Sequence, residues 1–182
     1  MTCVIRTVEI DLGFSLRDKM SVITREEALE LIENSSKYDH SMMVSRIMET
    51  LADIFHEDIV EWGLVGLLHD LDHDVIDGDM SKHGIVAAEM LKGRLPEGSL
   101  HAIRAHDHRA GVAPHGLLDE SLIFTDGLAV LIEDQALSTT MDSPALERAL
   151  RVEGDEKPWV AETIRAYCIS KGVEVTQILG RL

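Results

Sequence analysis

The chain has 182 residues, of which 45% are hydrophobic and 4% aromatic, and its formal net charge is −16. This length suits one domain with a full-sized hydrophobic core, and the hydrophobic content excludes a wholly disordered chain. A surface this acidic repels a phosphate backbone, which argues against general nucleic-acid binding. A small anionic substrate is still compatible with it, because a bound metal would dominate the local field.

The sequence shows no pattern typical of a disulfide framework, a targeting segment or a membrane span. Cys3 and Cys168 are too few and too far apart for a disulfide framework or a thiolate zinc site. The N-terminus has no basic region followed by an apolar stretch, and apolar runs such as Gly63–Leu68 are far shorter than a membrane span. These observations predict a soluble, cytoplasmic protein that does not associate with membranes.

Helical patterns dominate the chain after residues 1–19, which show no helical period. The segment Thr24–Glu27 has the pattern of a capping box and opens the first helix. A second helix is expected over residues 37–55, where apolar residues recur at helical spacing. Another capping box at Asp58–Glu61 opens a third helix, which is expected to reach residue 70.

Four aspartates and a glycine between Leu71 and Met80 predict a loop. A fourth helix is expected over residues 81–94, capped by its serine, and a fifth over residues 96–108, opened by its proline. After a loop with a proline and two glycines, a sixth helix is expected over residues 118–136.

The C-terminal part predicts shorter helices. They are expected over residues 143–152 and 159–171, joined by a polar link at 154–158 and followed by a turn or two from Val175. No internal repeat, low-complexity tract or convincing strand pairing is present in the sequence. The expected fold class is therefore all-α, a compact multi-helix bundle.

The domain organisation follows from these breaks. We expect an N-terminal extension at residues 1–19 and a main helical domain at 20–138. The helices of residues 139–182 are expected to pack on that same domain, because only a short polar break precedes them. Whether the protein is a monomer or a homo-oligomer is left open by the sequence.

Six ionisable side chains occupy positions where helix periodicity places apolar ones. His40, for example, shares its helix stripe with Val44 and Ile47. The full set is His40, His69, Asp70, His83, His106 and Asp126. One such histidine could be a core residue bonded to a backbone carbonyl, and one such aspartate a structural carboxylate, but buried carboxylates need partners and several residues coincide here. Imidazoles and carboxylates together suit a divalent transition metal or magnesium, so the pattern predicts a metal site.

The order of these residues resembles the HD superfamily of metal-dependent phosphohydrolases. His40, the pair His69–Asp70 and Asp126 follow one another on successive predicted helices. The segment Gly66–Asp72 is the most specific part, since it resembles the region around the namesake pair of that family. The resemblance covers about residues 24–136 and implies an HD-domain bundle with additional C-terminal helices.

The resemblance also implies the ligands of one or two divalent metal ions. The first ion would be held by His40, His69, Asp70 and Asp126. A second would be held through His83 and His106, with His108 as the rival of His106 and Asp70 as the bridge. The metal itself is left open among Mn, Fe, Co, Ni, Zn and Mg.

The implied activity is cleavage of a phosphoester of a nucleotide or another small phosphorylated metabolite by a metal-activated water. Candidates for the acid that protonates the leaving group are His73, Asp72 and His108. Candidates for holding the substrate phosphate are Lys82 and Arg109. The pair is not followed by the Ile-Gly of the HDIG subgroup, and motifs of enzymes that cleave cyclic dinucleotides do not align, so such substrates are not expected.

Two other functional classes fit the same residues. A few HD-fold proteins are di-iron oxygenases, and the six predicted ligands would suit such a centre. A non-catalytic HD-like sensor or interaction module is the other alternative. The presence of every expected ligand argues against it, because a purely structural domain does not need them.

Overall fold

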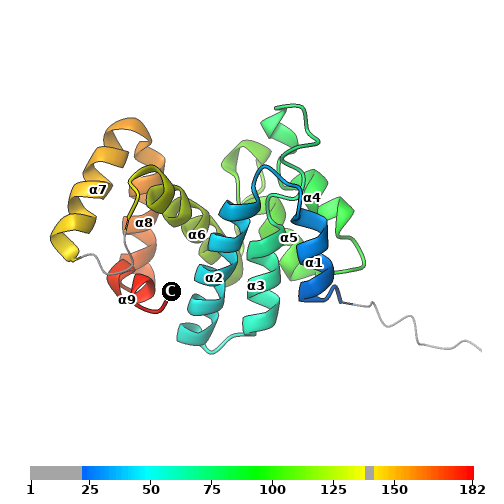
Figure 1. Cartoon of the computed structure of the whole chain (residues 1–182), viewed down its shortest axis with the longest axis horizontal. Coiled ribbons are helices and arrows are strands. Elements are labelled where there is room, and N and C mark those ends of the chain that lie inside the picture. The colour runs from blue at the N-terminus through cyan, green and yellow to red at the C-terminus, as the bar shows by residue number, and fades with distance from the viewer. Residues whose placement is uncertain (1–21, 138–141) are drawn as a thin grey trace, which may run out of the picture.

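A computed structural model of the chain describes residues 22–137 and 142–182 (Figure 1). The extension expected at residues 1–19 lies outside the described residues. The described ranges contain helices and no β-strand, which confirms the all-α prediction. In chain order the helices are α1 (Arg25–Ile32), α2 (Tyr38–Phe55), α3 (Ile59–Leu68), η1 (Met80–Lys82), α4 (Ile85–Met90), α5 (Glu97–Ala105), η2 (His108–Ala110), α6 (Leu117–Asp134), α7 (Ser143–Glu156), α8 (Pro158–Lys171) and α9 (Val175–Leu179), where η marks a short 3-10 helix.

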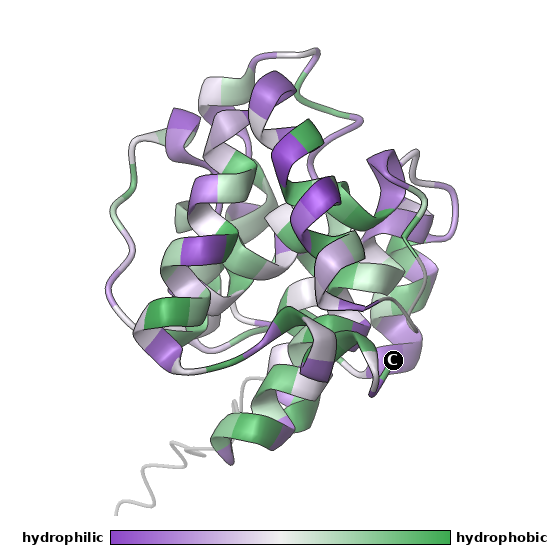
Figure 2. Cartoon of the chain, turned by 90° about the vertical axis from the view of Figure 1, so that its left-hand side faces the viewer, coloured by the Kyte–Doolittle hydropathy of each residue, from purple (hydrophilic) through white to green (hydrophobic). Residues whose placement is uncertain are grey.

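Helices α2 and α3 lie side by side in the middle of the molecule (Figure 1). Their backbones approach closely at Gly66, where a Cβ atom would lie 2.9 Å from the Ser45 Cα. Helix α6 packs against α2 and α5, and α8 packs against α6. One hydrophobic core runs from α1 to α9. Seen from the side of the C-terminal helices, hydrophilic and hydrophobic residues alternate around the helices, as expected for helices with one buried face (Figure 2).

The predicted helix starts differ in how completely they are capped. Thr24 Oγ1 accepts a hydrogen bond from the Glu27 backbone N–H at 3.2 Å, and the Glu27 carboxylate accepts one from the Thr24 N–H at 2.9 Å. The first capping box is therefore confirmed. Asp58 caps α3 as predicted, but the Glu61 carboxylate accepts a hydrogen bond from the Ser99 hydroxyl instead of returning to the cap. The second predicted capping box is therefore only half formed, because its glutamate links α3 to α5 and does not bond to the cap residue.

The fourth helix is much shorter than the predicted range of residues 81–94. Met80–Lys82 form the 3-10 turn η1, and α4 begins only after Gly84, whose φ is +74°. A Cβ atom at Gly84 would lie 2.3 Å from the Ile103 carbonyl oxygen. The left-handed glycine breaks the helix and lets the backbone touch the end of α5.

Gly84→Ala is expected to destabilise the fold much more than Gly93→Ala. Both glycines have nearly the same φ, +74° and +76°, but a Cβ at Gly93 would meet nothing within 4 Å. The left-handed conformation should cost each variant about 1–2 kcal/mol, and the contact with Ile103 should add about 1–3 kcal/mol at Gly84 alone. Urea denaturation of the two variants measures the difference. Equal losses would contradict the close approach.

Two further boundaries were placed wrongly by the sequence. Helix α5 ends at Ala105, before the predicted end at His108, because the chain turns there into η2. Helix α7 continues to Glu156, so the polar link expected at residues 154–158 is helical up to that residue. Glu153, in this extension, is fully buried.

Candidate metal centre

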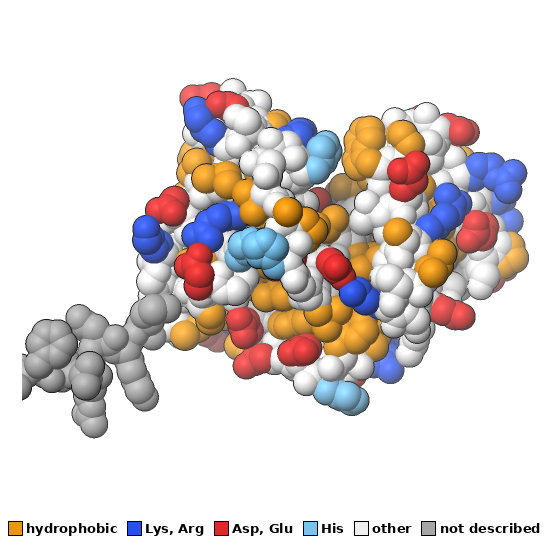
Figure 3. Space-filling view, turned by 180° about the vertical axis from the view of Figure 1, so that it is seen from behind, with side chains coloured by type: hydrophobic (Ala, Val, Ile, Leu, Met, Phe, Trp, Pro, Cys, Tyr) orange, Lys and Arg blue, Asp and Glu red, His pale blue; other side chains and the backbone are white. Residues whose placement is uncertain are grey.

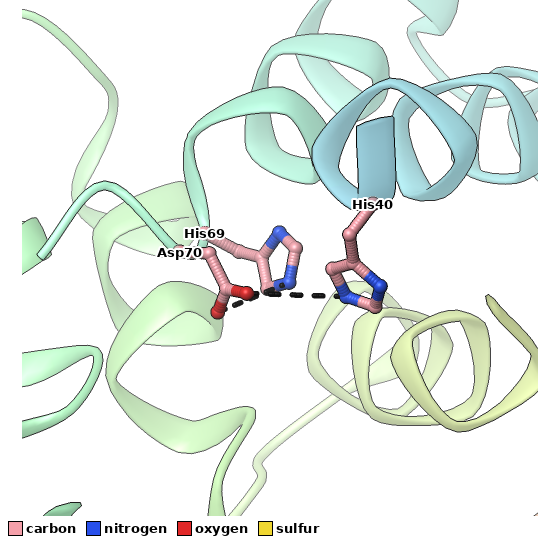
Figure 4. A group of neighbouring side chains, drawn as sticks. All are labelled: His40, His69 and Asp70. Atoms are coloured by element: carbon pink, nitrogen blue, oxygen red, sulfur yellow. Dashed lines mark ion pairs between the residues drawn. The ribbon is translucent and has the colours of Figure 1, made fainter. Parts of the chain in front are cut away.

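The structure brings the six predicted ligands together between α2, α5 and α6 and the segments that follow α3 and η1. Asp70 lies at the middle of this group, next to the last turn of α3. Its Oδ1 is 3.3 Å from His69 Nε2 and 3.0 Å from His83 Nε2. Its Oδ2 is 3.9 Å from His40 Nε2. Figure 4 shows the side chains of His40, His69 and Asp70 pointing toward one another.

Two overlapping groups of side chains have the spacing of metal ligands. His40, His69 and Asp70 form one, and Asp70, His83 and His106 form the other, with the ligand atoms of each within 4.8 Å of one another. Asp70 belongs to both, so two metal ions would share this carboxylate if both groups held one. Asp126, from α6, adjoins the first group, with its Oδ1 3.0 Å from His40 Nε2 and 3.8 Å from His69 Nε2.

Two of the histidines are held by the helix ends from which they project. His69 Nδ1 donates to the Gly66 carbonyl at 2.8 Å, three residues earlier in the chain. His106 Nδ1 donates in the same way to the Ile103 carbonyl at 2.7 Å. Each bond uses a carbonyl of the last helical turn and fixes the tautomer, so that the Nε2 lone pair faces the centre.

The other two histidines are held by carboxylates. His83 Nδ1 donates to Asp72 at 2.8 Å, and His40 Nδ1 lies 3.0 Å from Glu133 Oε1. This is the arrangement by which metal-binding histidines are usually oriented, with the second nitrogen bonded to an outer carboxylate or carbonyl. Glu133 comes from α6, seven residues after Asp126, which places both carboxylates on one face of that helix.

The donor set fits a divalent metal. His69 Nε2 is buried and has no hydrogen-bond partner among the described residues. His83 Nε2 and His106 Nε2 lie only 3.1 Å apart. When each ring carries its proton on Nδ1, both of these nitrogens present a lone pair and neither can donate a hydrogen bond to the other. Lone pairs that face one another around two carboxylates need a shared cation or additional protons. Four imidazoles with two carboxylates are the ligands expected of Mn, Fe, Co, Ni or Zn.

The acid–base state of the centre reflects this crowding. Burial disfavours the charged form of His83, but its hydrogen bonds to Asp70 and Asp72 outweigh burial and raise its pKa to about 9. Burial also raises the pKa of Asp70, but the charge of His69 and the hydrogen bonds from His106 and His83 reverse this and hold it well below its usual range. Without a metal, the centre therefore retains a proton on His83 at neutral pH.

Metal affinity is expected to rise with pH for this reason. His83, with its pKa of about 9, is protonated at neutral pH in the metal-free protein, so a metal that binds Nε2 must displace that proton. Between about pH 6.5 and 8 the affinity should increase close to tenfold per pH unit for each proton released. Calorimetry in buffers with different ionisation enthalpies counts the protons. The His83→Ala variant should release fewer, and an affinity independent of pH would contradict the assignment.

A cavity of about 710 Å³ opens beside the centre, and His40, Asp70, His83 and Asp126 form part of its lining. Figure 3 shows this face of the molecule, where the surface is hollowed between the C-terminal helices and the rest of the chain. The cavity gives a small molecule access to both ligand groups. It is also much larger than a water-filled metal site alone would need.

Three of the predicted catalytic and substrate-binding residues line this cavity. His73 is partly buried, and its Nδ1 has no hydrogen-bond partner among the described residues. His108 lies at the rim with 79% of its side chain exposed, and it is His106, not this rival, that the structure groups with the other predicted ligands. Arg109 also lines the cavity, where it is bonded to Asp107.

The other two predicted residues do not face the cavity. Asp72 is fully buried, with one oxygen bonded to His83 and the other to the Ala87 backbone N–H at 2.9 Å. It therefore positions a ligand and is not placed to protonate a leaving group. Lys82 is 61% exposed, with its Nζ 2.9 Å from Asp79, because the chain forms η1 where a longer helix was predicted.

Sequence reasoning missed Lys37, Lys157 and Trp159, which also line the cavity. Lys37 Nζ lies 4.0 Å from Asp70 Oδ2. Its position three residues before His40 could have indicated this, since that spacing gives one helix face. No sequence signal pointed to Lys157 and Trp159, because their place depends on how α8 docks.

Comparison with known proteins gives one match. The sequence model of the HD domain matches residues 38–149, well over half of the chain, from the start of α2 into α7. The match contains all six predicted ligands, although it begins later and ends later than the resemblance seen in the sequence, about residues 24–136. Neither the curated proteins nor the solved structures contain a match to this chain. No helix in the described ranges is long and apolar enough to cross a membrane. The family match and the buried histidine–aspartate groups agree: the chain belongs to the HD-domain family of the metal-dependent phosphohydrolase superfamily.

Proposed function

We propose that the protein is a metal-dependent phosphohydrolase that cleaves a phosphoester of a nucleotide or another small phosphorylated metabolite. One observation carries the proposal: four histidines are held through Nδ1 by protein acceptors, so that every Nε2 turns toward Asp70 beside an open cavity. A structural histidine needs only one satisfied nitrogen, whereas a metal-binding histidine needs one nitrogen held by the protein and the other turned toward further ligands. Membership of the HD-domain family supports the same reading.

Each of the two ligand groups would hold one divalent ion. The ligands proposed for the first are His40, His69, Asp70 and Asp126, and those for the second are Asp70, His83 and His106. When bound, a divalent metal supplies Lewis acidity toward a phosphoryl group and lowers the pKa of water toward neutrality.

The remaining residues of the cavity bind the substrate and deliver a proton. Lys37 lies next to Asp70, where its ammonium group can hold an oxygen of the reacting phosphoryl group. His73 lines the cavity with 35% of its side chain exposed, and its Nδ1 is buried, so its Nε2 would donate the proton to the departing alcohol. The four proposed ligand histidines are buried, so bulk water would reach the reacting atoms through the cavity and not through the protein interior.

The test is hydrolysis of a panel of nucleotides and simple phosphate esters with Mn, Co, Mg or Ni. The wild-type protein should release phosphate, and a variant carrying His69→Ala and Asp70→Ala should not. Equal behaviour of the two proteins would contradict the proposed site. Two iron atoms per chain after aerobic purification, without hydrolysis of any ester, would favour oxidation chemistry instead.

A further inference from the structure

We infer that the first turn of α8 selects the substrate, and that the substrate carries one phosphoryl group on a flat aromatic body, as a nucleoside monophosphate does. This inference rests on the proposed function and names the substrate class for the same site. It is carried by four features of the cavity: the fixed position of α8, an exposed tryptophan, the volume of the cavity, and the pairing of its cations.

The position of α8 beside the metal centre is fixed by α6. Tyr167 lies 2.6 Å from the Ser121 hydroxyl through its own hydroxyl group, and its ring stacks on Phe124 with centroids 4.2 Å apart. Further toward the start of α8, Val160 packs over Gly127, where a Cβ atom would lie 3.8 Å from Val160 Cγ1. Gly127 follows the ligand Asp126 directly, so the first turn of α8 lies next to the ligand.

Trp159, in that first turn, offers a flat apolar surface to the cavity. Its side chain lines the cavity, yet 56% of its surface is exposed, which leaves a face free for a ligand. Thr163, one turn later on the same helix face, lines the cavity as well, and Ile123 and Val130 of α6 add apolar wall. Stacking of a base on an aromatic side chain is worth about 1–3 kcal/mol.

The size of the cavity agrees with a substrate larger than a bare phosphate ester. Its volume of about 710 Å³ lies in the range of about 300–1,000 Å³ that is typical of sites for drug-sized ligands. A phosphate group at Lys37 and the metal ligands would leave much of this volume empty. Water would then lie against the exposed indole ring of Trp159, and an aromatic group would displace it favourably.

The cations of the cavity restrict the number of phosphoryl groups. Arg109 is bonded through Nε to both oxygens of Asp107, at 2.9 Å each, and Lys157 is bonded to Asp134. Both charges are thus neutralised by carboxylates of the protein itself. The third cation among the described lysines and arginines of the lining is Lys37, which lies at the metal centre with its Nζ 4.0 Å from Asp70 Oδ2. A second or third phosphate would meet no uncompensated cation in a strongly acidic protein.

The experiment compares binding of non-hydrolysable phosphonate analogues to the metal-loaded protein by calorimetry. The probes are the analogues of adenosine monophosphate, of ribose phosphate and of adenosine triphosphate, at one constant free metal concentration. The proteins are the wild type, Trp159→Ala, Trp159→Phe and the control Ile169→Ala, which changes an 84% exposed residue on the same helix.

The wild type should bind the adenosine monophosphate analogue at least about tenfold more tightly than the ribose phosphate analogue, the ratio expected from one stacked base. Trp159→Ala should lose this ratio, and Trp159→Phe and Ile169→Ala should keep most of it. Equal binding of the two analogues, no binding of either, or an unchanged ratio in Trp159→Ala would overturn the inference. Tighter binding of the triphosphate analogue would overturn the restriction to one phosphoryl group. Selective binding without hydrolysis of adenosine monophosphate would count against the proposed function alone.

Discussion

Asp70→Ala is expected to remove metal from both halves of the centre at once. The Asp70 carboxylate is the one side chain common to the two ligand groups, and its loss also removes the carboxylate nearest to His69 Nε2 and His83 Nε2. Metal analysis should find two ions per wild-type chain and fewer than one in the variant. Hydrolysis should fall by more than about 100-fold, since even the loss of an outer partner of a metal ligand costs about 10–100-fold.

His83→Ala is the matched comparison for this prediction. His83 belongs only to the second ligand group, so its loss should leave one ion with His40 and His69. The expected series is therefore two ions in the wild type, one in His83→Ala and fewer than one in Asp70→Ala. Circular dichroism checks that each variant is folded. Full metal content in a folded Asp70→Ala protein would show that the carboxylate does not bridge the groups.

His73→Ala is expected to slow the hydrolysis of alkyl phosphates by about 100-fold or more, which is the usual contribution of a positioned general acid. A p-nitrophenyl phosphate substrate should lose far less, because its leaving group departs without a proton. The ring of His73 lies 6.0 Å from the ring of the ligand His83, so a proton donor at this place is close to the reacting atoms. The kcat values for both esters are compared in wild type and variant.

His108→Ala separates the two candidates for the acid. His108 is mostly exposed at the rim, and its Nδ1 lies 3.8 Å from Asp107. Its removal should change the ratio of the two kcat values less than about threefold. If hydrolysis of the alkyl phosphate slowed relative to p-nitrophenyl phosphate in His108→Ala and not in His73→Ala, His108 would be the proton donor.

The placement of the ligands could be predicted from the sequence, although not always for the right reason. His40 faces the core because it shares a helix face with Val44 and Ile47, as the spacing indicates. His83 was expected to face inward as part of a helix with Met90, but it has extended backbone and Met90 is 48% exposed. What turns His83 inward is its hydrogen bond to Asp72, and no local periodicity encodes a bond between segments 11 residues apart.

The rest of the cavity could not be read from the sequence because it depends on tertiary docking. Lys157 and Trp159 reach the site only through the packing of α8 on α6, which involves Tyr167 and Phe124. Lys82 shows the opposite error. It precedes the predicted ligand His83 in the sequence, but its side chain pairs with Asp79 and points away from the metal centre. Spacing within one helix predicted contacts well, and proximity across loops did not.

The long sequence separations within the metal centre have a consequence for the lifetime of the chain. His40 and Asp126, whose side chains meet, are 86 residues apart, so an unfolded chain contains no comparable set of ligands. A metal would then bind the folded state alone and deepen its free-energy minimum by about 2.7 kcal/mol at a hundredfold excess over its dissociation constant. The metal concentration would therefore control how often the chain unfolds and becomes accessible to proteases. The same ions would then affect both the hydrolysis of substrate and the degradation of the protein.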